Sequence, residues 1–157
     1  MVVELDFNGI LDAMGDVPGF DFGPANLASA ETLREAYGGC GPDRWPQNIR
    51  DRLDENTVLY APAIVVHDLE FFESNCDYDR MHEANERFHR NNRAIFRNAY
   101  PFWTWRMLRP SYRLARAKSF AIMTALNIAT SDVFTRKAWK DGFIAKKNRV
   151  VDSKRFS

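Results

Sequence analysis

The clearest pattern of apolar and polar positions along the chain follows Asp77. Apolar residues recur there every three or four positions, which is the spacing of one face of an α-helix. The stripe also includes two asparagines and runs through Met81, Ala84, Asn85, Phe88, Asn92, Ile95 and Phe96. The segment Asp77-Tyr78-Asp79 can cap the start of such a helix. We therefore predict a long helix after this segment, with two polar exceptions on its buried face.

Start and stop residues predict the other helices. Ser29 suits the N-cap of a short helix that stops at Gly38-Gly39. Pro62 suits the first position of the next helix, because its missing N–H would have no helical partner. After the long helix, another is predicted at about residues 111–129, and Ser131 can cap a last short helix through Trp139. The helix at about residues 111–129 carries Tyr112, Ala115, Phe120, Met123 and Asn127 on related faces. The predicted fold class is mainly α.

Composition favours one domain with an extension at each end. The chain has 157 residues, of which 45% are apolar, and this is enough to bury one core. Residues 1–28 are rich in Gly, Pro and Asp and show no helical period, so they are interpreted as an irregular N-terminal arm. Residues 29–139 then form the helical domain, and residues 140–157 form a basic tail.

The net charge of +1 conceals a strong asymmetry. Residues 1–79 contain 16 acidic and 4 basic residues, whereas residues 80–157 contain 18 basic and 5 acidic residues. The two halves are expected to attract each other. The basic end of the chain suits an anionic partner such as lipid headgroups, nucleic acid or an acidic protein surface. The alternative is a solvated surface that keeps the protein soluble.

The sequence indicates neither a membrane span nor an export signal. It contains no run of 18 or more apolar residues. Residues 1–12 carry acids but no Lys or Arg, whereas a secretory signal starts with positive charge. Cys40 and Cys76 are too few for a disulfide-stapled fold, and the sequence is compatible with two thiols or one bridge. We therefore expect a cytoplasmic or virion-associated protein.

A glycine-rich loop is the first candidate for chemistry. The segment from Tyr37 to Pro42 reads Tyr-Gly-Gly-Cys-Gly-Pro. Glycines permit backbone conformations that turn several carbonyl oxygens toward one point, and calcium binds such oxygens readily. The alternative for this segment alone is the end of a helix followed by a turn.

The second candidate is the pair His67-Asp68 in an otherwise apolar helix. Adjacent helix positions point about 100° apart, so the imidazole can face water and substrate while the carboxylate faces a metal. Asn85, on the buried stripe of the next helix, needs a hydrogen-bond partner, because an unpaired buried amide costs about 1–3 kcal/mol. We predict that Asn85 pairs with one nitrogen of His67 and leaves the other nitrogen able to act.

The order of these motifs resembles the compact bacterial and phage branch of the phospholipase A2 family. The resemblance spans about residues 33–139, with the Cys-Gly-Pro loop, the His67-Asp68 helix and the helices after it. It implies a small fold with two core helices and hydrolysis of phospholipid acyl esters at a membrane surface. It also implies a calcium ion held by backbone carbonyls around Gly39 and Gly41 and by Asp68, with His67 as the general base that activates water.

Two positions depart from the family pattern. Asn85 stands where an aspartate is expected, and Phe71 stands where a tyrosine is expected. An amide oxygen can fix the tautomer of His67, but it does not compensate the charge of the imidazolium. Loss of that role in an analogous triad lowers the rate about 10⁴-fold. Asp77 or Asp79 can restore the charge if one of them reaches in from the loop before the helix.

These departures leave a second hypothesis open, that of a catalytically degenerate relative. Such a protein would be a structural subunit of a larger assembly, for example a phage virion. Its contacts with other protein subunits would run through residues 1–28 and 140–157. Nucleic-acid binding has the right charge in the basic half but no recognised reading motif, and is disfavoured.

A metal site on the long helix is the remaining alternative. His82, Glu86 and His89 lie at i, i+4 and i+7 and share one face. Glu-x-x-His is a ligand spacing of di-iron bundles, but that motif needs a second copy on another helix, which the sequence lacks. These three residues are therefore interpreted as part of a solvated face.

Overall fold

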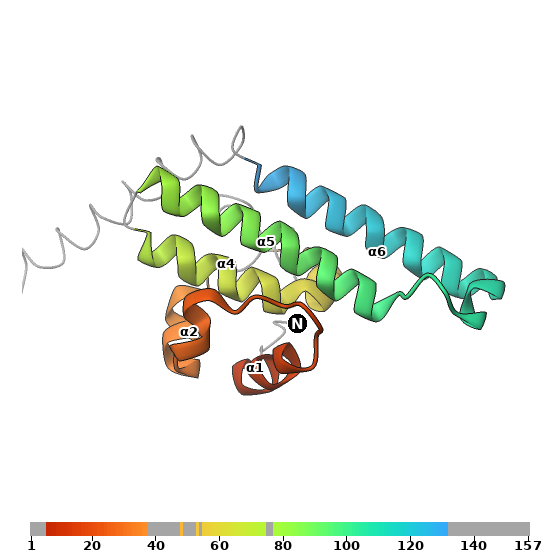
Figure 1. Ribbon diagram of the computed structural model, residues 1–157, viewed down its shortest axis with the longest axis horizontal. Coiled ribbons are helices and arrows are strands. Elements are labelled where there is room, and N and C mark those ends of the chain that lie inside the picture. The colour runs from red at the N-terminus through yellow and green to blue at the C-terminus, as the bar shows by residue number, and fades with distance from the viewer. Residues whose placement is uncertain (1–5, 38–47, 49–52, 54, 75–76, 132–157) are drawn as a thin grey trace, which may run out of the picture.

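The computed structural model describes residues 6–37, 48, 53, 55–74 and 77–131 (Figure 1). These residues form helices and contain no β-strand, which confirms the predicted mainly α fold class. The described α-helices are α1 (Phe7–Gly15), α2 (Ala30–Ala36), α4 (Ala61–Glu73), α5 (Tyr78–Ala99) and α6 (Pro110–Ala129). Three short 3-10 helices accompany them, η1 (Gly23–Leu27), η2 (Val58–Tyr60) and η3 (Trp105–Leu108).

The helices α2, α4 and α5 begin close to the residues that the sequence predicts as their starts. The side chain of Ser29 accepts a hydrogen bond from a backbone N–H in the first turn of α2 (3.1 Å). Asp77 does the same at the start of α5 (2.9 Å). Pro62 lies in the first turn of α4, and Pro110 is the first residue of α6. Residues 132–157, which include most of the predicted last helix and the basic tail, lie outside the described residues.

α4 and α5 lie side by side in the centre of the fold (Figure 1). α6 runs along α5, and α1 and α2 pack against α4. Nearly every residue of α4 from Ala61 to Leu69 is buried, as expected for a helix that is apolar all round. α5 buries a single stripe, and all seven residues that the sequence places on this stripe are buried. The amphipathic pattern of α5 is therefore confirmed.

The described residues form two hydrophobic core clusters, and α4 contributes to both. The first cluster joins α4 to the N-terminal elements and contains Met14, Ala25, Leu33, Ala36, Val65, Val66 and Leu69. The second joins α4 to η2, α5 and α6 and contains Tyr60, Ala63, Ile64, Phe88, Ile95, Phe96 and Met123. Because α4 is packed from two sides, its polar side chains are held in fixed positions.

The prediction of an irregular arm at residues 1–28 is wrong for part of the segment, which contains the nine-residue helix α1. Asp6 caps α1 by accepting a hydrogen bond from the Gly9 N–H (3.1 Å). Met14 and Ala25 are almost completely buried in the cluster that α4 shares. This tertiary packing stabilises the helix although its glycines have a low helix propensity. The prediction of an irregular arm relied on that low propensity.

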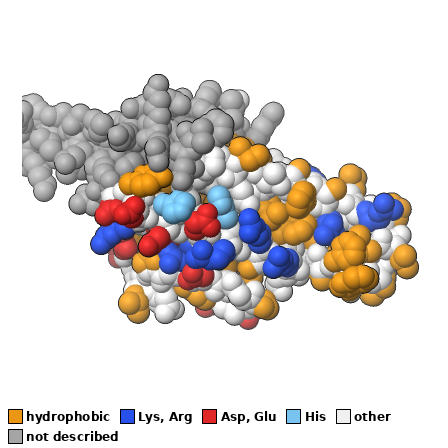
Figure 2. Space-filling model, turned by 45° about the horizontal axis from the view of Figure 1, so that its top comes forward, with side chains coloured by type: hydrophobic (Ala, Val, Ile, Leu, Met, Phe, Trp, Pro, Cys, Tyr) orange, Lys and Arg blue, Asp and Glu red, His pale blue; other side chains and the backbone are white. Residues whose placement is uncertain are grey.

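α6 is buried less than its sequence pattern predicts. Ser119 and Met123 are buried, but Phe120, which was assigned to a related face, is exposed, as is Leu114. Figure 1 shows the reason, since the end of α5, η3 and the first half of α6 extend beyond α4 and the N-terminal elements. Figure 2 shows hydrophobic side chains at the surface of this end. None of the described helices is long and apolar enough to span a bilayer.

Candidate functional site

His67 lies on α4 and faces α5, where Asn85 lies opposite it. The Nε2 atom of His67 is 3.0 Å from the Oδ1 atom of Asn85, and both side chains are buried. The predicted contact between these residues is therefore confirmed. Because an amide oxygen only accepts hydrogen bonds, Nε2 of the neutral imidazole carries the proton and donates it. The lone pair is then on Nδ1.

Two phenylalanine rings pack against the imidazole of His67. The centroid of the Phe71 ring lies 4.2 Å from the imidazole centroid, and that of the Phe88 ring lies 4.8 Å from it. Phe71 follows His67 by one turn on α4, whereas Phe88 comes from α5. The imidazole is thus held by a hydrogen bond and by two rings from different helices. Phe71 therefore contacts His67 through its ring.

Asp68 lies beside the other nitrogen of His67. Its Oδ1 atom is 3.7 Å from Nδ1 of His67, and its side chain is 21% exposed. This separation is longer than a hydrogen bond but close enough for an ion pair once the imidazole is protonated. The sequence predicts that the two side chains face different ligands, whereas the structure brings the nitrogen lone pair and the carboxylate toward one location. That location combines a base with an anionic ligand.

Of the three predicted calcium ligands, the structure describes Asp68 alone. Asp68 supplies a half-buried carboxylate, which is a ligand type that calcium prefers. Gly39 and Gly41, whose carbonyls are the other predicted ligands, lie outside the described residues, as do Cys40 and Cys76. Within the described ranges, no three His, Cys, Asp or Glu residues gather into a metal-binding group. A calcium site at Asp68 therefore depends on backbone oxygens of the glycine-rich loop.

Asp77 and Asp79 are poorly placed to assist His67. Asp77 caps α5, Asp79 lies in its first turn, and both are exposed, whereas His67 is buried. The rival metal site on α5 is also poorly formed, because His82 and Glu86 are exposed. The interpretation of that face as solvated is correct for these two residues.

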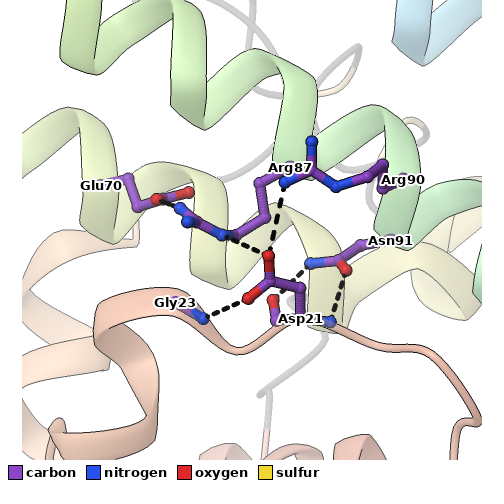
Figure 3. Close-up of polar contacts among 6 residues, drawn as sticks. All are labelled: Asp21, Gly23, Glu70, Arg87, Arg90 and Asn91. Atoms are coloured by element: carbon purple, nitrogen blue, oxygen red, sulfur yellow. Dashed lines mark hydrogen bonds and ion pairs between the residues drawn. The ribbon is translucent and has the colours of Figure 1, made fainter.

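An ion-pair network fixes how α4 and α5 face each other (Figure 3). Arg87 on α5 pairs with Glu70 on α4, and its Nε atom also lies 3.0 Å from Oδ2 of Asp21. Glu70 follows His67 by one turn on α4, and Arg87 follows Asn85 by two residues on α5. The Arg87–Glu70 pair therefore holds the register at which His67 meets its partner.

Asp21 anchors the N-terminal segment to α5 through backbone and side-chain contacts (Figure 3). Asn91 accepts a hydrogen bond from the Asp21 N–H (2.8 Å) and donates one to its carbonyl (2.9 Å). Burial by itself raises the pKa of the Asp21 carboxyl, but hydrogen bonds from Arg87, the Gly23 N–H and Arg90, with the charge of Arg87, outweigh it. The pKa of Asp21 therefore lies below the ordinary value of 3.8, and the anchor is ionised at neutral pH.

A second group of polar contacts joins α5 to α6. Asn92 donates a hydrogen bond to Asn127 (2.9 Å), and Nε2 of His89 lies 3.1 Å from the Thr130 hydroxyl. Burial lowers the pKa of His89 below 6.5 despite the nearby charge of Glu86. Asn92 is a polar residue on a predicted apolar stripe. Its position indicates that it has a buried hydrogen-bond partner, but the sequence does not identify that partner. Asn91, the anchor of Asp21, gave no such signal.

Comparisons with known proteins leave the chain without an assigned relative. No family model matches it, and no curated protein and no solved structure matches it.

Proposed function

We propose that the protein is a calcium-dependent hydrolase of phospholipid acyl esters, of the phospholipase A2 type, with His67 as its general base. The observation that carries this proposal is the 3.0 Å contact between Nε2 of His67 and Oδ1 of Asn85. It assigns the proton to Nε2 and the lone pair to Nδ1, the nitrogen nearer the Asp68 carboxylate. This arrangement suits ester hydrolysis by activated water, because the base has a fixed tautomer and lies beside a carboxylate that can bind a metal ion.

Each residue of the site has a separate task in this proposal. Nδ1 of His67 removes a proton from water, while Asn85, Phe71 and Phe88 keep the imidazole in position. The Asp68 carboxylate, 3.7 Å from Nδ1, stabilises the imidazolium that forms. Bound calcium would supply positive charge for the oxyanion of the ester, and Asp68 with the carbonyls around Gly39 and Gly41 would hold it.

Asn85 sets the expected activity. A neutral amide orients the imidazole but leaves Asp68 as the carboxylate that offsets its positive charge, so the rate should lie below that of a site with a second carboxylate at position 85. The loss in an analogous triad is about 10⁴-fold, and it includes the effect of a wrong imidazole tautomer, so this figure is an upper limit for Asn85. We therefore expect slow turnover that a single substitution accelerates.

The test is fatty-acid release from phosphatidylcholine vesicles in the presence of calcium, by the full chain and by Asn85→Asp. The Asn85→Asp protein should be faster, by up to about 10⁴-fold. Asn98→Asp is the matched control, because it makes the same change at an exposed position of the same helix. His67→Ala should abolish release in both backgrounds. Undiminished release in a chelator, or after His67→Ala, would contradict the proposal.

One observation favours a second candidate, a structural protein without catalysis in a multi-subunit assembly such as a phage virion. The partner of His67 is an amide, which suits a buried structural contact as well as a catalytic one. If this candidate is right, Asn85→Asp gains no activity and calorimetry detects no calcium binding that Asp68→Asn removes. The described part of the segment 1–28 packs on α4, so subunit contacts there would use only its outer surface.

A further inference from the structure

The end of the α5–α6 hairpin exposes more large apolar side chains than any other described part of the molecule. We call residues 101–114 the hairpin tip. Its exposed apolar residues are Phe102 (55%), Trp103 (91%), Trp105 (61%), Leu108 (86%) and Leu114 (73%). Contiguous exposed apolar surface of this kind marks an interaction site in a folded protein.

The tip is an ordered structure and not a loose loop. Its backbone makes turn hydrogen bonds, including Met107 N–H to the Thr104 carbonyl (3.0 Å) and Arg109 N–H to the Arg106 carbonyl (3.0 Å). The Tyr112 hydroxyl donates to the Pro101 carbonyl (3.2 Å), which ties the first turn of α6 to the end of the connection. The exposed aromatic rings therefore project from a defined scaffold.

Basic residues surround these apolar side chains. Residues 87–131 contain nine Lys and Arg residues and no Asp or Glu. Arg106, Arg109 and Arg113 lie within the tip itself, and the Arg109 guanidinium lies 4.5 Å from the Trp105 ring centroid. Figure 2 shows the resulting surface, where hydrophobic and basic side chains gather at the same end of the molecule. The partner must therefore accept both apolar insertion and positive charge.

We propose that the hairpin tip docks onto the surface of an anionic lipid bilayer. Tryptophan and phenylalanine settle at the boundary between headgroups and acyl chains, where an amphipathic ring is favoured. Leu108 enters the acyl region, and the three arginines contact headgroup phosphates. A fluid bilayer accepts a projecting end without a complementary cavity.

Two features favour a bilayer over the other anionic partners. Leu108 and Leu114 are among the most exposed side chains of the tip, and aliphatic groups do not stack on nucleobases. Single-stranded nucleic acid is bound along a basic groove, whereas the connection between α5 and α6 forms a projecting end of the molecule (Figure 1). The proposal concerns a surface remote in sequence from His67 and does not rest on the proposed hydrolase activity, although docking would bring ester substrate to the protein.

The first experiment measures sedimentation of the full chain with phosphatidylcholine vesicles that contain or lack phosphatidylserine. We expect binding to the anionic vesicles, and a loss of roughly tenfold or more for the double variant Trp103→Ser/Leu108→Ser. The matched control is Leu27→Ser/Ile128→Ser, which removes two exposed apolar residues outside the tip. Arg106→Gln should weaken binding roughly fivefold, and the exposed Arg80→Gln should change it little.

A second measurement covers the case in which the tip variant fails to fold. Brominated lipids should quench the tryptophan fluorescence of the unaltered protein, and less so in Trp103→Phe. Binding is measured in a chelator and with His67→Ala, so that loss of hydrolysis leaves the result intact. Equal binding by the tip variant and its control would overturn the proposal. So would binding to a single-stranded oligonucleotide but not to vesicles, or tip-dependent self-association without vesicle binding.

Discussion

The contact between His67 and Asn85 pairs two buried polar side chains and places the imidazole proton on Nε2. Replacing Asn85 with Leu leaves the Nε2–H of His67 buried without an acceptor, which should lower the free energy of unfolding by about 1–3 kcal/mol. Urea unfolding measures this loss. Asn98→Leu on the exposed face of α5 is the control and should change stability by about 0.5 kcal/mol or less. Equal effects of both substitutions would mean that the buried contact contributes nothing.

The half-buried side chain of His89 should make the stability of the protein depend on pH. Burial keeps the folded-state pKa of His89 below 6.5, so the unfolded chain binds a proton more readily than the folded chain. The contribution of His89 to the free energy of unfolding is present above about pH 6.5 and is lost as the pH falls through the folded-state pKa. His89→Gln should therefore lose less stability than the wild type between neutral and mildly acid pH.

The measurement is urea unfolding at several pH values across this window. His82→Gln, at an exposed position of the same helix, is the matched control. An unchanged pH dependence in His89→Gln would show that its burial does not affect proton uptake on unfolding.

At the scale of elements, the ion pairs of α5 differ in their contributions. Arg87 and Arg90 both pair with Asp21, but Arg87 also neutralises Glu70, whose side chain is only 9% exposed. Arg87→Met leaves that carboxylate unpaired and should cost about 3 kcal/mol, the lower end of the range for broken buried pairs. Arg90→Met removes a pair that is largely exposed and should cost at most about 1 kcal/mol.

Urea unfolding of the two variants tests this difference. Because both substitutions remove the same side chain from the same helix, helix propensity cancels in the comparison. If Arg90→Met proves as destabilising as Arg87→Met, the Glu70 contact does not fix the register of α4 and α5.

The sequence predicted elements better than it predicted their partners. Ser29, Pro62 and Asp77 act locally, through orphan N–H groups at helix starts, so their effect can be inferred from a few residues. α1 could not be inferred in this way, because its stability comes from Met14 packing on a helix about fifty residues later. Helix existence is local information, whereas packing partners are not.

The sequence predicted the pairing of His67 with Asn85 but missed the role of Asn91. Asn85 interrupts an apolar stripe, and His67 was the conspicuous polar residue on the preceding helix, so pairing them required only one helix–helix contact. Asn91 lies off the predicted stripe and pairs with the backbone of Asp21, 70 residues earlier, and no periodicity marks a backbone partner. The predicted ligands Gly39 and Gly41 lie outside the described residues.

At the scale of the whole molecule, the acidic and basic halves of the chain meet at Arg87. Asp21 and Glu70 belong to the acidic half and Arg87 to the basic half, so the network realises part of the attraction that the charge distribution predicts. From this junction residues 88–114 extend toward the hairpin tip, and they contain basic residues but no Asp or Glu. One end of the molecule is therefore stabilised by its own charges, and the other offers charge to a partner.

The N-terminal segment provides the last prediction, because it separates a structural role from a docking role. Deletion of residues 1–28 removes Met14 and Ala25 from the core and leaves Arg87 without Asp21. A buried methionine alone is worth about 2–5 kcal/mol, and domains are stable by only about 5–15 kcal/mol. The shortened chain should therefore lose cooperative urea unfolding, followed by circular dichroism, whereas a chain that begins at Asp6 should keep it. A shortened chain as stable as the full one would mean that α4 needs no cover from α1 and that the segment does not stabilise the fold.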